Sequence, residues 1–83
     1  MVVKYFSWIK EHIGKSEEQF DLPRNIANVN QLINYLNEID EKYNIIFEKK
    51  ALIKIAVNKT YSSFDTNISN SDEIAFFPPV TGG

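Results

Sequence analysis

The length, composition and charge of the chain exclude several classes of function. Its 83 residues, of which 43% are hydrophobic and 24% charged, suit one small globular domain, and a net charge of −2 is too weak to recruit nucleic acid or an anionic membrane. The chain has no cysteine and one histidine, which excludes disulfides and thiolate chemistry and argues against a histidine-based metal site.

The N-terminal part of the sequence is expected to form two strands joined by a short helix. VVKYF, residues 2–6, is β-branched and aromatic and predicts a strand, whereas SEEQFDL, residues 16–22, predicts a weaker one. Between them, Ser7 can cap a helix over residues 8–13 that Gly14 would end. Charged residues interrupt the apolar start, so we expect neither a signal peptide nor a membrane span, and the protein is expected in the cytoplasm.

Residues 28–43 carry the clearest helical pattern of the chain. Asn28, followed three residues later by Gln31, resembles the capping box that begins many helices. Six apolar side chains then follow at helical spacing along one stripe: Val29, Leu32, Ile33, Leu36, Ile39 and Tyr43. We therefore predict one helix that packs this stripe against a sheet or another helix.

An alternating segment follows the connector after this helix. LIKIAVN, residues 52–58, predicts a strand in which two sets of side chains face opposite ways: Ile53, Ile55 and Val57 on one side, and Leu52, Lys54 and Ala56 on the other. The turn pair Asn58-Lys59 then leads into TYSSF, residues 60–64, which predicts a further short extended segment.

A polar loop and one more strand complete the predicted elements. DTNISNSD, residues 65–72, has the composition of a loop, and EIAFF, residues 73–77, predicts a strand that the two following prolines stop. Strands in one layer and helix in the other make a two-layer α+β domain over residues 1–77. Residues 78–83 are expected to form an extended C-terminal tail.

Strand alternation predicts an exposed aromatic patch. Four strand side chains are expected to face the core: Val3, Tyr5, Ile74 and Phe76. By the same rule Ala75 and Phe77 point outward from the last strand, and Phe6 points outward after the first. Phe6, Tyr61 and Phe77 would then lie together, which favours a protein interface over scattered surface aromatics.

The terminal motif and the order of elements resemble a known family. The sequence is similar to the small subunits of molybdopterin synthase in four places: the K-x-x-x-x-I-K-E pattern at 4–11, Gly14 after the first helix, AVNKTYSSFD at 56–65 and DEIAFFPPVTGG at 72–83. Those subunits are sulfur carriers, and the resemblance implies their ubiquitin-like β-grasp fold, a mixed sheet packed on one main helix plus a short helix. A Gly-Gly end is shared by all β-grasp carriers, whereas AFFPPVTGG is typical of this branch.

The resemblance implies a chemical role for the end of the chain. An activating enzyme would adenylate the Gly83 carboxylate with ATP, and a persulfide sulfur donor would convert it to a thiocarboxylate. Within the large subunit, that group would donate sulfur to cyclic pyranopterin monophosphate and form the dithiolene of molybdopterin. The chain would be a non-catalytic subunit of a heterotetramer, active only with the large subunit, and would bind no cofactor stably.

The residue types of the tail suit that role. Gly82 and Gly83 have no Cβ and can enter a narrow channel, and Pro78 and Pro79 lower the entropy lost when the tail becomes ordered. Six extended residues can reach roughly 20 Å. The resemblance and the predicted patch together place seven residues at the partner interface: Phe6, Tyr61, Phe77, Pro78, Pro79, Val80 and Thr81.

Two other functions remain compatible with the sequence. A ubiquitin-like modifier would use Gly83 to form isopeptide bonds with lysines of target proteins. A sulfur carrier could instead serve thiamine synthesis or tRNA thiolation. The FFPP segment argues against both, since the thiamine carrier is similar in fold but usually lacks it.

Overall fold

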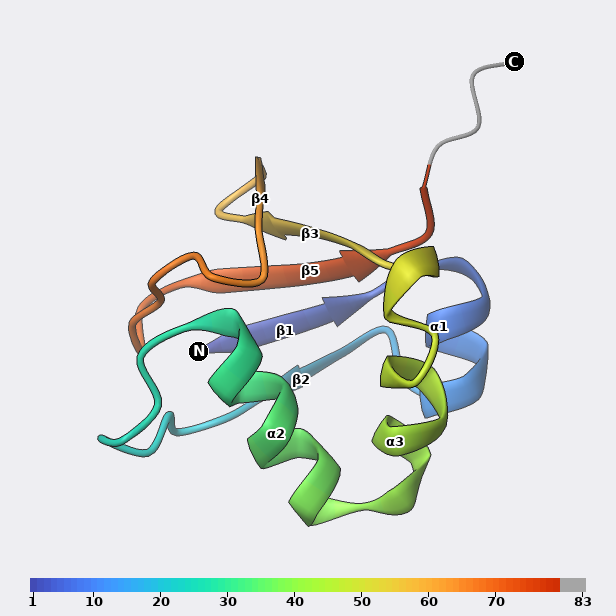
Figure 1. The fold of residues 1–83 in the computed structure, drawn as a ribbon, viewed down its shortest axis with the longest axis horizontal. Helices are drawn as coiled ribbons and strands as arrows, with labels where there is room; N and C mark the ends of the chain where they lie inside the picture. Colours follow the sequence, from blue (N-terminus) through green and yellow to red (C-terminus); the bar gives the residue numbers. More distant parts are fainter. Residues whose placement is uncertain (80–83) are drawn as a thin grey trace.

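Five strands form one mixed sheet in the computed structural model, which describes residues 1–79 (Figure 1). In chain order the strands are β1 (Val2–Tyr5), β2 (Glu17–Gln19), β3 (Lys54–Val57), β4 (Thr60–Ser62) and β5 (Glu73–Phe77). Across the sheet their order is β2-β1-β5-β3-β4. The central strands β1 and β5 run parallel, whereas all other neighbours are antiparallel. The first and last strands of the chain therefore lie side by side in the middle of the sheet.

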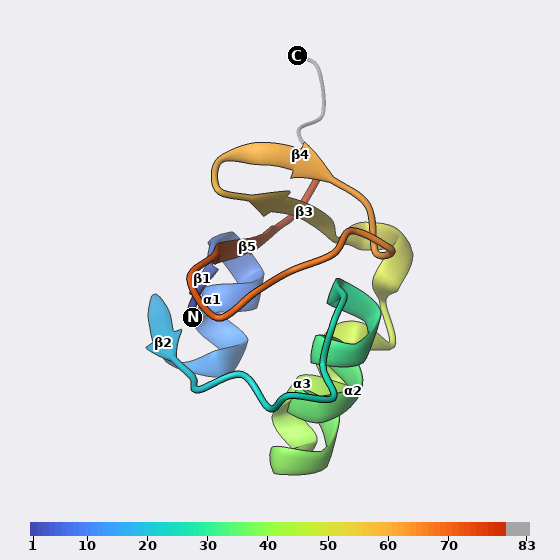
Figure 2. The same cartoon turned by 90° about the vertical axis from the view of Figure 1, so that its left-hand side faces the viewer.

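The helices supply the second layer. They are α1 (Ser7–Ile13), α2 (Val29–Ile39), α3 (Glu41–Phe47) and a 3₁₀ turn, η1 (Lys50–Leu52). Figure 2 shows α2 and α3 gathered on one side of the sheet. All four strand side chains predicted to face the core are buried there: Val3, Tyr5, Ile74 and Phe76. Over the described residues, none of the helices combines the length and apolar character needed to cross a membrane.

The start of α1 differs from the prediction, and its end confirms it. Ser7 does not cap the helix but is its first residue, with φ 56°, and the extended Phe6 precedes it without a side-chain cap. The reason is that strand pairing continues one residue further, because the Phe6 N–H donates to the Phe76 carbonyl at 3.2 Å. Gly14 ends α1 in the left-handed conformation, φ 86°, and its N–H donates to the Lys10 carbonyl at 2.8 Å.

The predicted capping residue of the main helix is confirmed, but the helix is shorter than predicted. Asn28 Oδ1 accepts from the Gln31 N–H at 2.9 Å. The chain then breaks at Asp40, which is extended (φ −158°, ψ 142°) and caps α3 by accepting from the Lys42 N–H at 3.0 Å. One predicted helix is thus two, and Ile39, expected in the apolar stripe, is 49% exposed at the end of α2.

Several strands are also shorter than predicted. Both β2 and β4 have three residues, and β3 begins at Lys54 because residues 50–52 form η1. Leu52 is exposed in that turn rather than paired in the sheet. Short edge strands are common because they offer little backbone for unwanted pairing.

One carboxylate joins the two layers at the sheet edge. Glu18 of β2 accepts hydrogen bonds from the hydroxyls of Tyr5, at 2.7 Å, and Tyr43, at 2.5 Å. Burial acts to raise the pKa of Glu18, but hydrogen bonds from Tyr43 and Tyr5 and the charges of Lys42 and Lys15 outweigh it, so that this pKa is lowered. Burial, followed by the contact with Glu18, raises the pKa of both tyrosines.

Candidate functional site: the open face of the sheet and the exit of the tail

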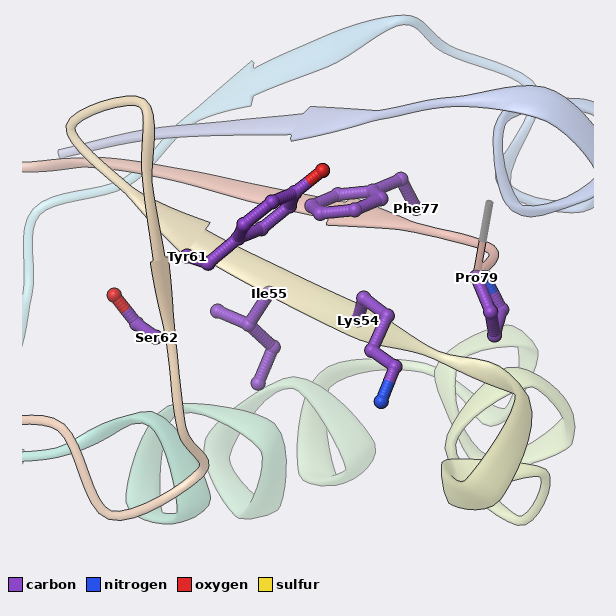
Figure 3. A pocket seen from close by; sticks show the side chains of 6 residues that line it. All are labelled: Lys54, Ile55, Tyr61, Ser62, Phe77 and Pro79. Atoms are coloured by element: carbon purple, nitrogen blue, oxygen red, sulfur yellow. The ribbon is translucent and has the colours of Figure 1, made fainter. Parts of the chain in front are cut away.

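The predicted aromatic patch lies on the face of the sheet opposite α2 and α3. Phe6 is 48% exposed and Tyr61 76% exposed, and Phe77 is partly exposed. The rings of Tyr61 and Phe77 lie side by side with their centroids 5.7 Å apart (Figure 3). The outward orientation predicted for these three side chains is confirmed. Hereafter this side of the sheet is called the open face.

Strand register explains how the patch is built. Ala56 of β3 lies opposite Tyr61 of β4 on one side and Ala75 of β5 on the other. Lys54, two residues earlier, lies opposite Phe77. Ala56 and Ala75 lie on the open face, but their exposed fractions are only 8% and 9%, because larger neighbours cover these small side chains. The two alanines lie between the larger aromatic side chains. Ala75 points outward as predicted, but it is buried rather than exposed.

Two shallow cavities lie beside the aromatic patch, and Phe77 lines both of them. One, of about 400 Å³, is lined by Lys54, Ile55, Tyr61, Ser62, Phe77 and Pro79 (Figure 3). The other, of about 510 Å³, includes Phe6, Ala56, Ala75, Phe77 and Pro78 in its lining. Each cavity is therefore lined both by side chains of the aromatic patch and by one of the two prolines.

The chain leaves the sheet at this same place. Phe77 is the last residue of β5, and Pro78 and Pro79 have no N–H with which to continue the pairing. Both prolines are partly exposed. The other predicted site residues, Val80, Thr81, Gly82 and Gly83, lie outside the described residues.

A side-chain amide joins the hairpin of Tyr61 to the start of the strand that ends at Phe77. Asn58 donates from Nδ2 to Asp72 Oδ1 and accepts at Oδ1 from the Glu73 N–H, both at 2.9 Å. The hydrogen bond from Asn58, followed by one from the Ser69 N–H, lowers the pKa of Asp72. The sequence predicted only a turn at Asn58, because its partner lies fourteen residues away in a loop.

The open face also carries charged side chains. Lys4 forms an ion pair with Glu73 at 3.3 Å, beside the larger cavity. Among residues 1–79, no three carboxylate or imidazole groups gather in a way that could hold a metal ion. The described part of the site therefore offers apolar contact, lysines and the exit of the tail, which suits binding of another protein.

Comparison with known proteins agrees with this geometry. The sequence pattern of the ThiS family matches residues 3–83. The chain belongs to the ThiS family. It is 36% identical over 81 residues to the molybdopterin synthase sulfur carrier subunit of Haemophilus influenzae, which covers 98% of this chain and 96% of the relative.

Solved structures agree in fold. A Pyrococcus furiosus chain, provisionally described as molybdopterin converting factor subunit 1, superposes with a TM-score of 0.72 at 33% identity over 95% of both chains. A chain in the complex of subunits 1 and 2 of the molybdopterin-converting factor from Helicobacter pylori gives 0.62 at 26% identity, over 99% of this chain and 96% of the other. These likenesses and the observed topology confirm the predicted ubiquitin-like β-grasp fold.

Proposed function

We propose that this chain is the sulfur carrier subunit of a molybdopterin synthase. The observation that carries the proposal is likeness over nearly the whole chain to a ThiS-family subunit of that name, at 36% identity. The sequence AFFPPVTGG and the position of Phe77 at the tail exit support it. The chain alone would not be an enzyme, because its part is to carry sulfur to a partner.

The proposed chemistry takes place at the Gly83 carboxylate. An α-carboxyl group has a pKa of about 3.3–3.7, so it is ionised at neutral pH and can attack the α-phosphorus of ATP in an activating enzyme, releasing pyrophosphate. A persulfide then attacks the acyl adenylate and releases AMP. A thiol cleaves the resulting acyl disulfide and leaves the thiocarboxylate. A chain without cysteine cannot divert the acyl group or the sulfur to its own thiol.

The proposed partner is the large subunit of the synthase, in a heterotetramer. The open face would supply affinity through Phe6, Tyr61 and Phe77, and the tail would reach the large subunit's active site, where sulfur passes to cyclic pyranopterin monophosphate. Ordering a four-residue tail costs about 4–8 kcal/mol of backbone entropy, so contact by the folded surface is needed to offset it. The Helicobacter pylori complex of subunits 1 and 2 supports the large subunit as the partner. Cytoplasmic residence and the use of ATP only through the activating enzyme belong to the same proposal.

Intact-mass measurement tests the proposal directly. After incubation with the activating enzyme, ATP and a persulfide donor, the chain should gain the mass difference between one sulfur and one oxygen. The product should then support molybdopterin formation when the large subunit and the pterin precursor are added. An unchanged mass under these conditions would contradict the proposal. Conjugates between Gly83 and lysines of cellular proteins would instead support a protein modifier.

A further inference from the structure

The charged side chains that line the two cavities beside the aromatic patch are mostly positive. Lys54 lines the smaller cavity, and Lys4, Lys59 and Glu73 line the larger. Glu73 already pairs with Lys4 at 3.3 Å. Within residues 1–79, neither Lys54 nor Lys59 takes part in an ion pair. The chain as a whole has nine basic and eleven acidic residues, so this face is locally positive on a chain that is negative in sum.

Lys59 also occupies a position that its residue type disfavours. It is the second residue of the turn between β3 and β4, and its φ of 67° lies in the left-handed region. Asn58, at φ 50°, tolerates that region well, whereas the second position of such a turn favours glycine. A lysine there makes the hairpin less stable than a glycine would, which raises the hypothesis that the Lys59 side chain has a function at this surface.

The Lys59 side chain does not offset this strain by interactions inside the domain. Its ammonium takes part in no hydrogen bond or ion pair with the described residues, and it lies beside the larger apolar cavity. Lys54 holds the corresponding place at the smaller cavity, where Figure 3 shows its amino group directed away from the Tyr61 and Phe77 rings. Within residues 1–79 both charges therefore lack an ionic partner, and each lines a cavity next to the aromatic patch.

We propose that Lys59 and Lys54 select a protein partner whose docking surface has an apolar centre and carboxylates at its edge. The inference rests on the proposed function and identifies that partner as the synthase large subunit. Its apolar centre would cover the aromatic patch, and its carboxylates would face Lys54 and Lys59. Charges at the rim of an interface act mainly on the association rate, its salt dependence and the rejection of wrong partners.

The test measures association of the full chain with the large subunit from the same organism by stopped flow at several salt concentrations. Replacing Lys59 and Lys54 together by glutamine should slow association on the order of tenfold at low salt. The difference should shrink as salt screens the charges. Lys10→Gln is the control for the loss of one positive charge, to be compared with each single lysine variant as well as with the pair, because Lys10 is an exposed residue of α1 outside both cavities. It should leave the association rate nearly unchanged.

Lys59→Gly separates the binding role from folding. It should raise the melting temperature of the free domain by roughly 4 °C, since it removes the left-handed lysine, while slowing association. Equal effects of Lys10→Gln and the lysine pair, salt-independent association, or a Lys59→Gly variant that melts at a lower temperature would overturn the inference. A wild-type chain that does not bind the large subunit at any salt concentration would instead overturn the proposed function.

Discussion

Phe76 and Phe77 are neighbours in β5 with opposite surroundings. The Phe76 side chain is fully buried, with its ring 5.0 Å from Phe47 and 6.4 Å from Tyr5, measured between centroids. The Phe77 side chain is partly exposed on the open face beside Tyr61. Two identical residues of one strand therefore lie on opposite faces of the sheet. One holds the sheet to the helices, and the other remains available to a partner.

The largest loss of activity is expected from changes at the C-terminal Gly83. Deleting Gly83, or adding residues after it, should abolish formation of the thiocarboxylate and of molybdopterin, because the reacting carboxylate is lost or displaced. Thermal unfolding should hardly change, since the buried core side chains lie between Val3 and Phe76. Molybdopterin production by the shortened chain at the wild-type level would contradict the assignment of Gly83.

The next effect tests the core side. Phe76→Ala should reduce the free energy of unfolding by about 3–5 kcal/mol, because it removes a fully buried ring and leaves a cavity beside Phe47. Denaturant unfolding of the isolated domain measures the change. A loss of less than about 1 kcal/mol would show that the packing around this ring can rearrange to fill the space.

Phe77→Asp makes the corresponding change on the open face. It should weaken binding of the large subunit by about 2 kcal/mol or more, as expected for an aromatic anchor at the centre of an interface. The free domain should keep its fold, which circular dichroism can verify before calorimetry measures the affinity. If the substitution unfolds the domain, Phe77 belongs to the core side and the comparison with Phe76 fails.

The smallest change in stability is expected at Glu18 in the edge strand β2, which accepts hydrogen bonds from Tyr5 and Tyr43. Glu18→Gln should reduce stability at neutral pH by about 1 kcal/mol, since the charged acceptor of two hydroxyls is lost. The folded-state pKa of Glu18 is lowered, so its contribution is complete above the unfolded-state value of about 4.3 and is lost as pH falls through the folded-state pKa.

The pH dependence of unfolding tests whether the folded-state pKa of Glu18 is lowered. The difference in unfolding free energy between wild type and Glu18→Gln should narrow as pH falls below about 4.3. Glu11→Gln, at an exposed position of α1, serves as the control. A difference that widens toward low pH would mean that the folded-state pKa of Glu18 is raised instead.

Local rules predicted the two sides of β5 from the sequence. Alternation along a strand depends only on backbone geometry, so Ile74 and Phe76 could be assigned to the core and Phe77 to the open face. Gly14 and Asn28 were also predictable, because each acts on groups within a few residues. The resemblance in the terminal motif predicted the family, which strand and helix patterns alone could not have done.

Features that depend on distant partners were missed. The break at Asp40 falls inside an apolar period that continues to Tyr43, so the sequence pattern shows no interruption there. Ser7 was assigned as a cap because the pairing of Phe6 with Phe76 across the sheet cannot be seen locally. The contacts of Glu18 and Asn58 likewise join segments that lie 13 to 25 residues apart, so they exist only once the chain has folded.

The central place of β5 has a mechanical consequence. Hydrogen bonds hold this strand on both sides, to β1 and to β3. A pull along the axis of β5 is therefore shared by two ladders of hydrogen bonds, whereas in an edge strand a single ladder would carry it. If a partner holds the tail as we propose, both ladders would oppose separation of β5 from the sheet.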